Sequence, residues 1–267
     1  MNDGRIATVT REAARAGADV AIAAFRTTLD VGEKDGKTDL VTVTDRETQD
    51  AVVDRIRETF PEDTVYGEED GTDGYIPDTG RGWVIDPIDG TNNFVRGNRR
   101  FATSVACVRD GEPVAAANVL PAMDDTYVGT PGAVTRNGST VSVSERSDPD
   151  LFQVVPTIWW GFDRRGEFAR ATEAVVERFG DLRRLGSAQA ALSMLAGGGV
   201  EGVITNVETN AWDTVAGAAM VEWAGGTVTD LDGDPWQYDA RGLVASNGRN
   251  HDAVLAAARQ IDGTDPE

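Results

Sequence analysis

Four groups of acidic residues follow short apolar segments or open a predicted helix, and together they could hold a divalent cation. Carboxylates with no histidine or thiolate nearby are the ligands that hard, oxygen-seeking cations prefer, above all Mg²⁺. The pattern therefore indicates a magnesium site built from acids. The four groups are Asp45, the Gly-Glu-Glu-Asp run at 67–70, the Asp-Pro-Ile-Asp-Gly-Thr turn at 86–91, and Asp213 after Trp212.

The turn at residues 86–91 joins two of these acids to a possible phosphate site. Asp86 and Asp89 are three residues apart across Pro87, whose fixed φ helps to hold a turn in which both acids face one point. Gly90 permits close backbone approach, and the N–H groups of a helix that opens at Thr91 can bind a phosphate. A carboxylate pair beside such a turn is typical of metal-assisted phosphoryl chemistry.

Each group also has a purely structural interpretation. In a chain with 45 acids, the run at 67–70 can be a solvated loop and the segment at 86–90 an ordinary turn. Asp45 and Asp213 can be acids that complement a helix N-terminus. We favour the metal site because all four groups occur in one chain, each beside apolar residues with a strand-like pattern.

The composition excludes several other chemistries. The chain has 267 residues with one cysteine, Cys107, and one histidine, His251. One cysteine allows no internal disulfide and no cysteine-based metal cluster, and one histidine allows no several-histidine metal site. No apolar run approaches the roughly 18 residues of a membrane span, and the N-terminus lacks a signal-peptide pattern. We expect a soluble, cytoplasmic protein with no membrane partner.

The net charge of −20 bears on partners and environment. No long basic stretch is present, so we expect no nucleic-acid partner. Such a charge repels itself unless salt screens it, and only two of the 25 basic residues, Lys34 and Lys37, are lysines. This composition resembles that of halophile proteins; an acidic surface selected for solubility is the alternative.

Sequence patterning predicts the elements that position the acids. Apolar residues at helical spacing predict a helix over 6–24, and alternation predicts a strand over 40–44. A capping box at Thr44 opens the next helix, so Asp45 is predicted at a strand-to-helix junction. Two short buried strands run directly into acidic residues, over 64–66 and 83–85.

The two halves of the chain differ in pattern. Residues 101–144 predict antiparallel strands, with hairpin turns at Asp110-Gly111 and Asn137-Gly138. After residue 149, short strands alternate with helices. We expect an α/β protein whose halves share one cleft. An α+β half over 1–145 would bind metal and phosphate, and an α/β half over 146–267 would bind the substrate and add the last metal ligand.

Taken in order, these segments resemble the inositol monophosphatase superfamily. The resemblance rests on Trp-Val-Ile-Asp-Pro-Ile-Asp-Gly-Thr-Asn-Asn-Phe at 83–94, with Gly-Glu-Glu at 67–69 and Trp-Asp-Thr-Val-Ala-Gly at 212–217, and it extends over nearly the whole chain. It implies a layered α-β-α-β-α fold, a Mg²⁺-dependent, Li⁺-sensitive phosphatase and a homodimer. The composition favours the archaeal-type inositol monophosphatase/fructose-1,6-bisphosphatase branch.

The resemblance also implies roles for individual residues. Glu68 and Thr91, with Asp45 supporting Thr91, would orient and activate the metal-bound water that attacks the phosphorus directly. The amides of Gly90 and Thr91 would hold the phosphate. Two or three Mg²⁺ ions would be bound by Glu68, Asp86, the carbonyl of Ile88, Asp89 and Asp213. The rest of a small sugar or inositol phosphate would contact Asp89, Gly186, Ser187, Ala188, Asn206 and Asp213.

The sequence leaves the choice of substrate open. Members specialised for inositol have a glutamate seven residues before the aspartate that matches Asp213; here that position is Asn206, and Glu208 follows two residues later. We therefore expect fructose 1,6-bisphosphate to be hydrolysed at least as well as inositol 1-phosphate. A 3′-phosphoadenosine 5′-phosphate phosphatase and a non-catalytic regulatory member are the alternatives. The distal phosphate would meet one of Arg164, Arg165, Arg183 and Arg184.

Overall fold

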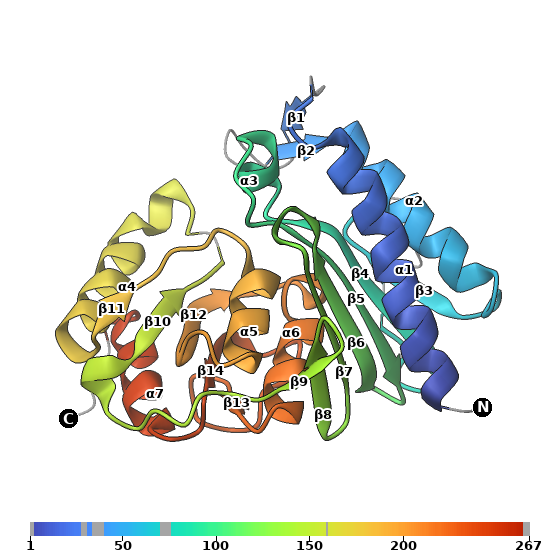
Figure 1. The fold of residues 1–267 in the computed structure, drawn as a ribbon. Coiled ribbons are helices and arrows are strands. Elements are labelled where there is room, and N and C mark those ends of the chain that lie inside the picture. The colour runs from blue at the N-terminus through green and yellow to red at the C-terminus, as the bar shows by residue number, and fades with distance from the viewer. Residues whose placement is uncertain (1–2, 28–30, 34–39, 70–75, 159, 264–267) are drawn as a thin grey trace.

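Five alternating layers of helix and sheet make up the chain (Figure 1). The computed structural model describes residues 3–27, 31–33, 40–69, 76–158 and 160–263. A seven-stranded sheet lies between an outer pair of helices and a central pair, and a five-stranded sheet lies between the central pair and a third pair. The predicted layered α-β-α-β-α fold is confirmed. The helix pairs are α1 (Asp3–Ala24) with α2 (Val43–Arg57), α5 (Ala188–Ala196) with α6 (Ala211–Trp223), and α4 (Arg165–Arg178) with α7 (His251–Gln260).

The seven-stranded sheet is almost wholly antiparallel. Only its first two strands are parallel to each other. Both predicted hairpin turns are present, because Asp110, Gly111, Asn137 and Gly138 all have positive φ, as a two-residue type I′ turn requires. In spatial order the strands are β3 (Thr64–Gly67), β4 (Arg81–Asp89), β5 (Ala102–Arg109), β6 (Glu112–Leu120), β7 (Asp125–Thr130), β8 (Ala133–Arg136) and β9 (Ser139–Val141).

The five-stranded sheet is mixed, and its strands alternate with helices along the chain. The second strand in spatial order is parallel to both of its neighbours, and the fourth is antiparallel to both of its own. No helix in the described part of the chain is both long and apolar enough to cross a membrane. In spatial order the strands are β11 (Asp181–Leu182), β10 (Gln153–Pro156), β12 (Gly202–Glu208), β14 (Arg241–Ser246) and β13 (Thr227–Thr229).

The helix that carries Asp45 begins earlier than the sequence predicts. β2 (Leu40–Thr42) pairs with β1 (Val31–Glu33), and the pairing ends at Thr42. α2 begins at Val43, directly after this strand. Asp45 therefore lies in the first helical turn directly after β2, at the predicted strand-to-helix junction, and it is almost fully buried there.

The central helices pack closely because a glycine lies between them. A Cβ atom on Gly217 of α6 would come within 2.5 Å of the Cβ atom of Leu192 on α5. The amide of Asn118 on β6 donates to the side chain of Gln189 on α5 at 2.9 Å, and Gln189 donates to the carbonyl of Trp212 at 2.7 Å. These contacts fix the first turns of α5 and α6 beside each other, where the predicted site residues lie.

Candidate active site

An irregularity in β4 brings Asp86 and Asp89 to the same side of the strand. β4 pairs with β5 as far as Asp86 opposite Ser104, and the register then shifts before Asp89. The Thr103 hydroxyl donates to the carbonyl of Pro87 at 2.8 Å within this break. Residues three apart face opposite sides of a regular strand, so the bulge is what lets the two carboxylates converge. Their side chains are buried, at 2% and 6% exposure.

Asp213 completes a cluster of three carboxylates. It lies in the first turn of α6, where the N–H of Asn210 donates to it in a capping box. One oxygen each of Asp86, Asp89 and Asp213 lies within 4.8 Å of the other two. Glu68, directly after β3, adds a charge that acts on both Asp86 and Asp213. The structure thus brings four predicted metal ligands together, whereas Asp70 lies outside the described residues.

The cluster is costly to ionise in the absence of a cation. Burial raises the pKa of Asp86 well above its usual range, and the charges of Glu68, Asp89 and Asp213 raise it further. Burial, together with the charges of Asp89 and Glu68, raises the pKa of Asp213 to about 8. One oxygen of Asp86 is buried without a hydrogen-bond partner in the described structure. A cation would satisfy that oxygen and offset the excess negative charge.

Asp89 also fastens the loop before α5 to the cluster. Its carboxylate accepts hydrogen bonds from the Ser187 hydroxyl, from the N–H of Ala188 at 3.1 Å and from the N–H of Gln189 at 2.6 Å. These bonds oppose the effect of burial, which raises the pKa of Asp89. The polar groups of Ser187 and Ala188, both predicted to contact the substrate, are thus used to position an acid of the cluster. Gly186, the third predicted contact in this loop, is exposed.

Gly90 and Thr91 form the turn that opens α3 (Thr91–Val95). Gly90 has a φ of 92°, and a Cβ atom there would lie 2.9 Å from the carbonyl oxygen of Gly186, so glycine is required. The Thr91 hydroxyl oxygen lies 3.1 Å from the carbonyl oxygen of Ile88 and 3.4 Å from a carboxylate oxygen of Asp45. The structure therefore joins Asp45 to Thr91, next to the acid at position 89.

The chain matches a known protein family along almost its whole length. The model of the inositol monophosphatase family covers residues 3–263. The chain belongs to the inositol monophosphatase family. It is 35% identical to the fructose-1,6-bisphosphatase/inositol-1-monophosphatase of Thermotoga maritima, over 86% of this chain and 87% of the relative. It is 31% identical to Nus factor SuhB of Pseudomonas aeruginosa, over 85% of each. The solved IMPase structure from Thermotoga maritima matches with a TM-score of 0.86 and 30% identity, over 97% of each chain.

In this member of the inositol monophosphatase family, Asn206 does not face the acid cluster. The residue is fully buried. Its side chain accepts from the indole N–H of Trp160 at 2.8 Å and donates to Glu167 and Asp262 at 2.6 Å each. Asn206 is two residues from Ile204 along β12, so the two side chains point to the same face of the strand. Ile204 packs against residues of α4 and α7 on that face. Asn206 is therefore a structural residue of the outer layer, and the prediction that it contacts the substrate is wrong.

The arginines predicted to meet a distal phosphate have other contacts. Arg164 and Arg183 each form an ion pair with a carboxylate nearby in the chain. Arg184 donates to two backbone carbonyls, and burial lowers the pKa of its guanidinium to about 10. Arg165 lies over the ring of the exposed Phe162, 4.7 Å from its centroid. Of these contacts, only those of Arg184, with the carbonyls of Pro156 and Ile158, join segments far apart in the sequence.

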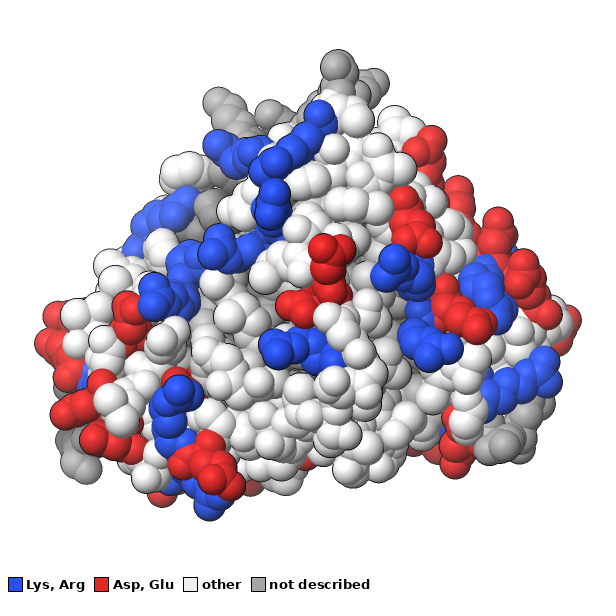
Figure 2. All heavy atoms as spheres, viewed as in Figure 1, with Lys and Arg blue, Asp and Glu red and all other residues white. Residues whose placement is uncertain are grey.

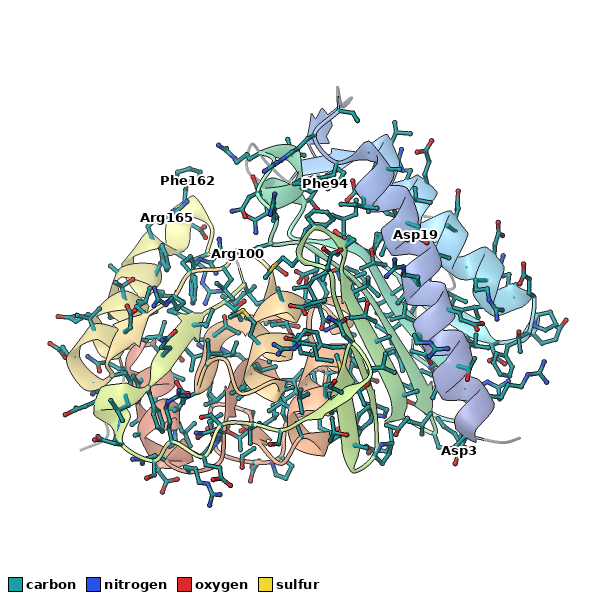
Figure 3. The ribbon with its side chains drawn as sticks, in the orientation of Figure 1. Asp3, Asp19, Phe94, Arg100, Phe162 and Arg165 are labelled. Atoms are coloured by element: carbon teal, nitrogen blue, oxygen red, sulfur yellow. The ribbon has the colours of Figure 1, made fainter. Side chains whose placement is uncertain are left out.

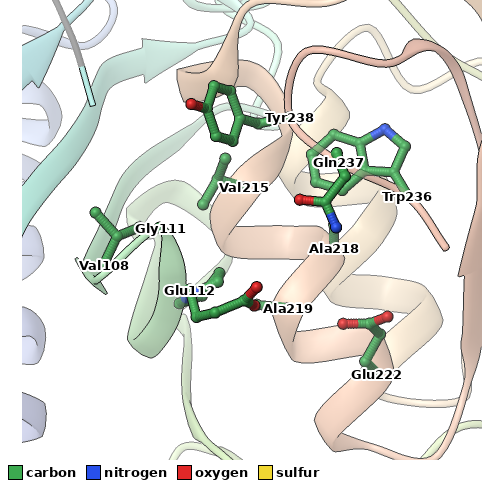
Figure 4. Close-up of a pocket in the computed structure, with 11 residues that line it drawn as sticks. Val108, Gly111, Glu112, Val215, Ala218, Ala219, Glu222, Trp236, Gln237 and Tyr238 are labelled. Carbon is green, nitrogen blue, oxygen red and sulfur yellow. The ribbon is translucent and has the colours of Figure 1, made fainter. Parts of the chain in front are cut away.

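A small pocket lies between the β5–β6 hairpin, α6 and residues 236–238 (Figure 4). Its volume is about 50 Å³. Two acids line it, Glu112 and Glu222, and burial together with the charge of Glu112 raises the pKa of Glu222. None of the predicted site residues borders this pocket. The acid cluster therefore lies apart from this pocket.

Proposed function

We propose that the chain is a Mg²⁺-dependent phosphomonoesterase that acts on small sugar or inositol phosphates. The observation that carries this proposal is the meeting of Asp86, Asp89 and Asp213 next to the Gly90-Thr91 turn. Membership of the inositol monophosphatase family supports it. Phosphate release from a generic phosphomonoester tests it, and we expect release by the purified protein with Mg²⁺ and none in excess EDTA.

The residues of the cluster suit Mg²⁺ by chemical type. Mg²⁺ prefers oxygen ligands, and every side chain of the cluster offers carboxylate oxygens. One oxygen of Asp86 has no hydrogen-bond partner among the residues that the structure describes. When bound, Mg²⁺ neutralises phosphoryl oxygens and lowers the pKa of water. We propose two or three ions, held by Glu68, Asp86, the carbonyl of Ile88, Asp89 and Asp213.

Thr91 is suited to orient the attacking water through its own hydrogen bonds. Asp45 and the carbonyl of Ile88 both lie on the side to which the Thr91 hydroxyl donates its hydrogen. The lone pairs of the Thr91 oxygen are then left to accept a hydrogen from the water. In this proposal Glu68 takes one proton from the water as its oxygen attacks the phosphorus, the bond between the phosphorus and the sugar oxygen breaks, and the departing sugar oxygen takes up a proton from solvent. The amides of Gly90 and Thr91 hold the phosphoryl oxygens.

Fructose 1,6-bisphosphate should be hydrolysed with a kcat/KM at least comparable to that for inositol 1-phosphate. Asn206, at the position where members specialised for inositol have a glutamate, is buried in the outer layer, so no acid from this position grips inositol hydroxyls or repels a second phosphate. The Thermotoga maritima relative, which is named for both substrates, supports the proposal. Measuring both substrates side by side tests it. A preference of tenfold or more for inositol 1-phosphate, about 1.4 kcal/mol in transition-state binding, would contradict it.

A regulatory role without catalysis is the second candidate function. The relative from Pseudomonas aeruginosa is named a Nus factor, which is the observation that favours it. The complete set of acids in the cluster favours catalysis instead. A panel of inositol 1-phosphate, fructose 1,6-bisphosphate and 3′-phosphoadenosine 5′-phosphate separates the two. A folded protein that releases phosphate from none of them in the presence of Mg²⁺ would support the regulatory role.

We also propose that the protein is adapted to high salt. A net charge of −20 favours expansion at low ionic strength, and molar KCl should screen the repulsion. The melting temperature should therefore rise steadily as KCl increases from low to multimolar concentration at constant pH. A melting temperature that stays flat across this range would leave the acidic composition with no role beyond solubility.

The family supports three further proposals about this chain. We propose that the chain forms a homodimer and that Li⁺ inhibits it. We also propose that residues 1–145 bind metal and phosphate, and that residues 146–267 bind the substrate and add the last metal ligand. Sedimentation tests the first, and a LiCl titration of phosphate release tests the second. A substitution of Gly186 that changes KM without changing Mg²⁺ affinity would support the third.

A further inference from the structure

The segment between α3 and β5 carries three arginines, Arg96, Arg99 and Arg100, and its backbone lies against the active site. Asn93 of α3 donates to the carbonyl of Arg100 at 2.6 Å and to that of Gly186 at 3.1 Å. A Cβ atom on Gly90 would lie 3.1 Å from the carbonyl oxygen of Arg100. Arg100 therefore borders both the Gly90-Thr91 turn and the exposed glycine of the loop before α5.

The backbone of this segment is held at several points. Arg26 donates two hydrogen bonds to the carbonyl of Gly97, at 3.1 and 2.9 Å. The N–H of Arg100 donates to the side chain of Asn98 at 3.2 Å. Together with the contact from Asn93, these bonds fix the position from which the arginine side chains project. A fixed backbone lowers the entropy lost when an arginine binds a ligand.

The positive charge of this segment is not neutralised within the described structure. Arg96, Arg99 and Arg100 are exposed, and none has a carboxylate within 4.0 Å among the described residues. Figure 2 shows basic side chains gathered in an arc along this edge of the molecule. Figure 3 places Arg100 in the gap between α3 and the N-terminal end of α4, with Phe162 and Arg165 on the other side. In a chain of net charge −20, this edge is suited to an anionic ligand.

We infer that Arg100, with Arg99 beside it, binds the second phosphate of a bisphosphorylated substrate and so determines specificity. The inference rests on the proposed function. With the reacting phosphate at the Gly90-Thr91 turn, the rest of a small substrate would extend over Gly186, whose carbonyl accepts from the same Asn93 amide as the carbonyl of Arg100. The planar guanidinium donates paired hydrogen bonds to phosphate oxygens. A monophosphate has no second phosphate to accept these hydrogen bonds, so they raise the affinity for the bisphosphate alone.

Kinetics of the double variant Arg99→Gln/Arg100→Gln test the inference. We expect its KM for fructose 1,6-bisphosphate to rise by about tenfold or more, because charge-assisted hydrogen bonds are lost. Its KM for inositol 1-phosphate and its kcat for both substrates should change by less than about twofold. Arg100→Lys keeps the charge without the planar fork, and its KM for the bisphosphate should fall in between. Arg11→Gln, at an exposed arginine of α1, is the matched control and should change neither KM.

Two results would overturn the inference while leaving the proposed function in place. One is a similar rise in KM for both substrates, and the other is an unchanged KM for the bisphosphate. The second result is also what we would expect if these arginines served a macromolecular polyanion such as RNA. A wild type that releases phosphate from neither substrate would instead overturn the proposed function itself.

Discussion

Replacing Asp86 or Asp213 with asparagine will remove most of the phosphatase activity without destabilising the metal-free protein. Each substitution takes one anionic ligand from the cluster, and stabilisation of transition-state charge is usually a term of several kcal/mol. The same substitution relieves repulsion between buried acids whose pKa values are raised. We therefore expect a fall in kcat of well over tenfold, together with an unchanged or higher melting temperature in EDTA.

The pH dependence of stability gives a second readout for Asp213. A carboxyl group whose pKa is higher in the folded protein than in the unfolded chain stabilises the fold when it is protonated. In the metal-free wild type, this stabilisation is complete below about pH 4. It is lost as the pH rises through about 8, the pKa of Asp213 in the folded protein. The melting temperature of Asp213→Asn should therefore exceed that of the wild type by an amount that grows between about pH 4 and about pH 8 and is constant above that range.

Asp252→Asn is the matched control for this prediction. Asp252 is also an aspartate in the first helical turn, on α7, but it is exposed. Its substitution should leave the activity unchanged. If Asp86→Asn or Asp213→Asn kept more than a tenth of the wild-type kcat at saturating Mg²⁺, a loss under about 1.4 kcal/mol, the metal assignment would be wrong.

Asp89→Ala will remove activity and will also destabilise the metal-free protein by about 3 kcal/mol. Its carboxylate accepts hydrogen bonds from the Ser187 hydroxyl and from the N–H groups of Ala188 and Gln189. All three donors are buried, so the substitution leaves them without a partner at the start of α5. Urea unfolding in EDTA measures the loss.

Asp86→Ala separates this effect from the removal of a buried charge. Asp86 is buried to a similar degree, but one of its oxygens has no hydrogen-bond partner in the described chain. We expect Asp86→Ala to be more stable than Asp89→Ala in the absence of metal. Equal free energies of unfolding for the two variants would show that the contacts between Asp89 and α5 do not contribute to stability.

The parts of the site that the sequence predicts are those with a local signal. Asp86 and Asp89 follow an apolar run and bracket a proline, and the turns at Asp110-Gly111 and Asn137-Gly138 have the residues that type I′ hairpins need. The layered fold follows from the change from antiparallel to alternating patterning near residue 149. These features depend on neighbours in the chain, so patterning and turn chemistry are enough to find them.

The parts that the sequence does not predict depend on which face a strand buries and on contacts between distant segments. Both faces of β12 are buried, so its residues show no alternation that would reveal on which side Asn206 lies. The bond between Ser187 and Asp89 joins residues 98 positions apart, and no local pattern marks it. No local pattern marks the position of Arg100 either. Its carbonyl accepts from the amide of Asn93, and this contact depends on how the 96–100 segment folds back toward α3.

Phosphate release from fructose 1,6-bisphosphate by wild type and Asp213→Asn, each with Mg²⁺ and with EDTA, tests the central claim most directly. The account predicts steady release by the wild type with Mg²⁺, little or none in EDTA, and at most a tenth of the wild-type rate for the variant at saturating Mg²⁺. Release by the wild type that is equally fast in EDTA, or a variant as active as the wild type, would contradict the claim that these acids form a metal-dependent phosphatase site.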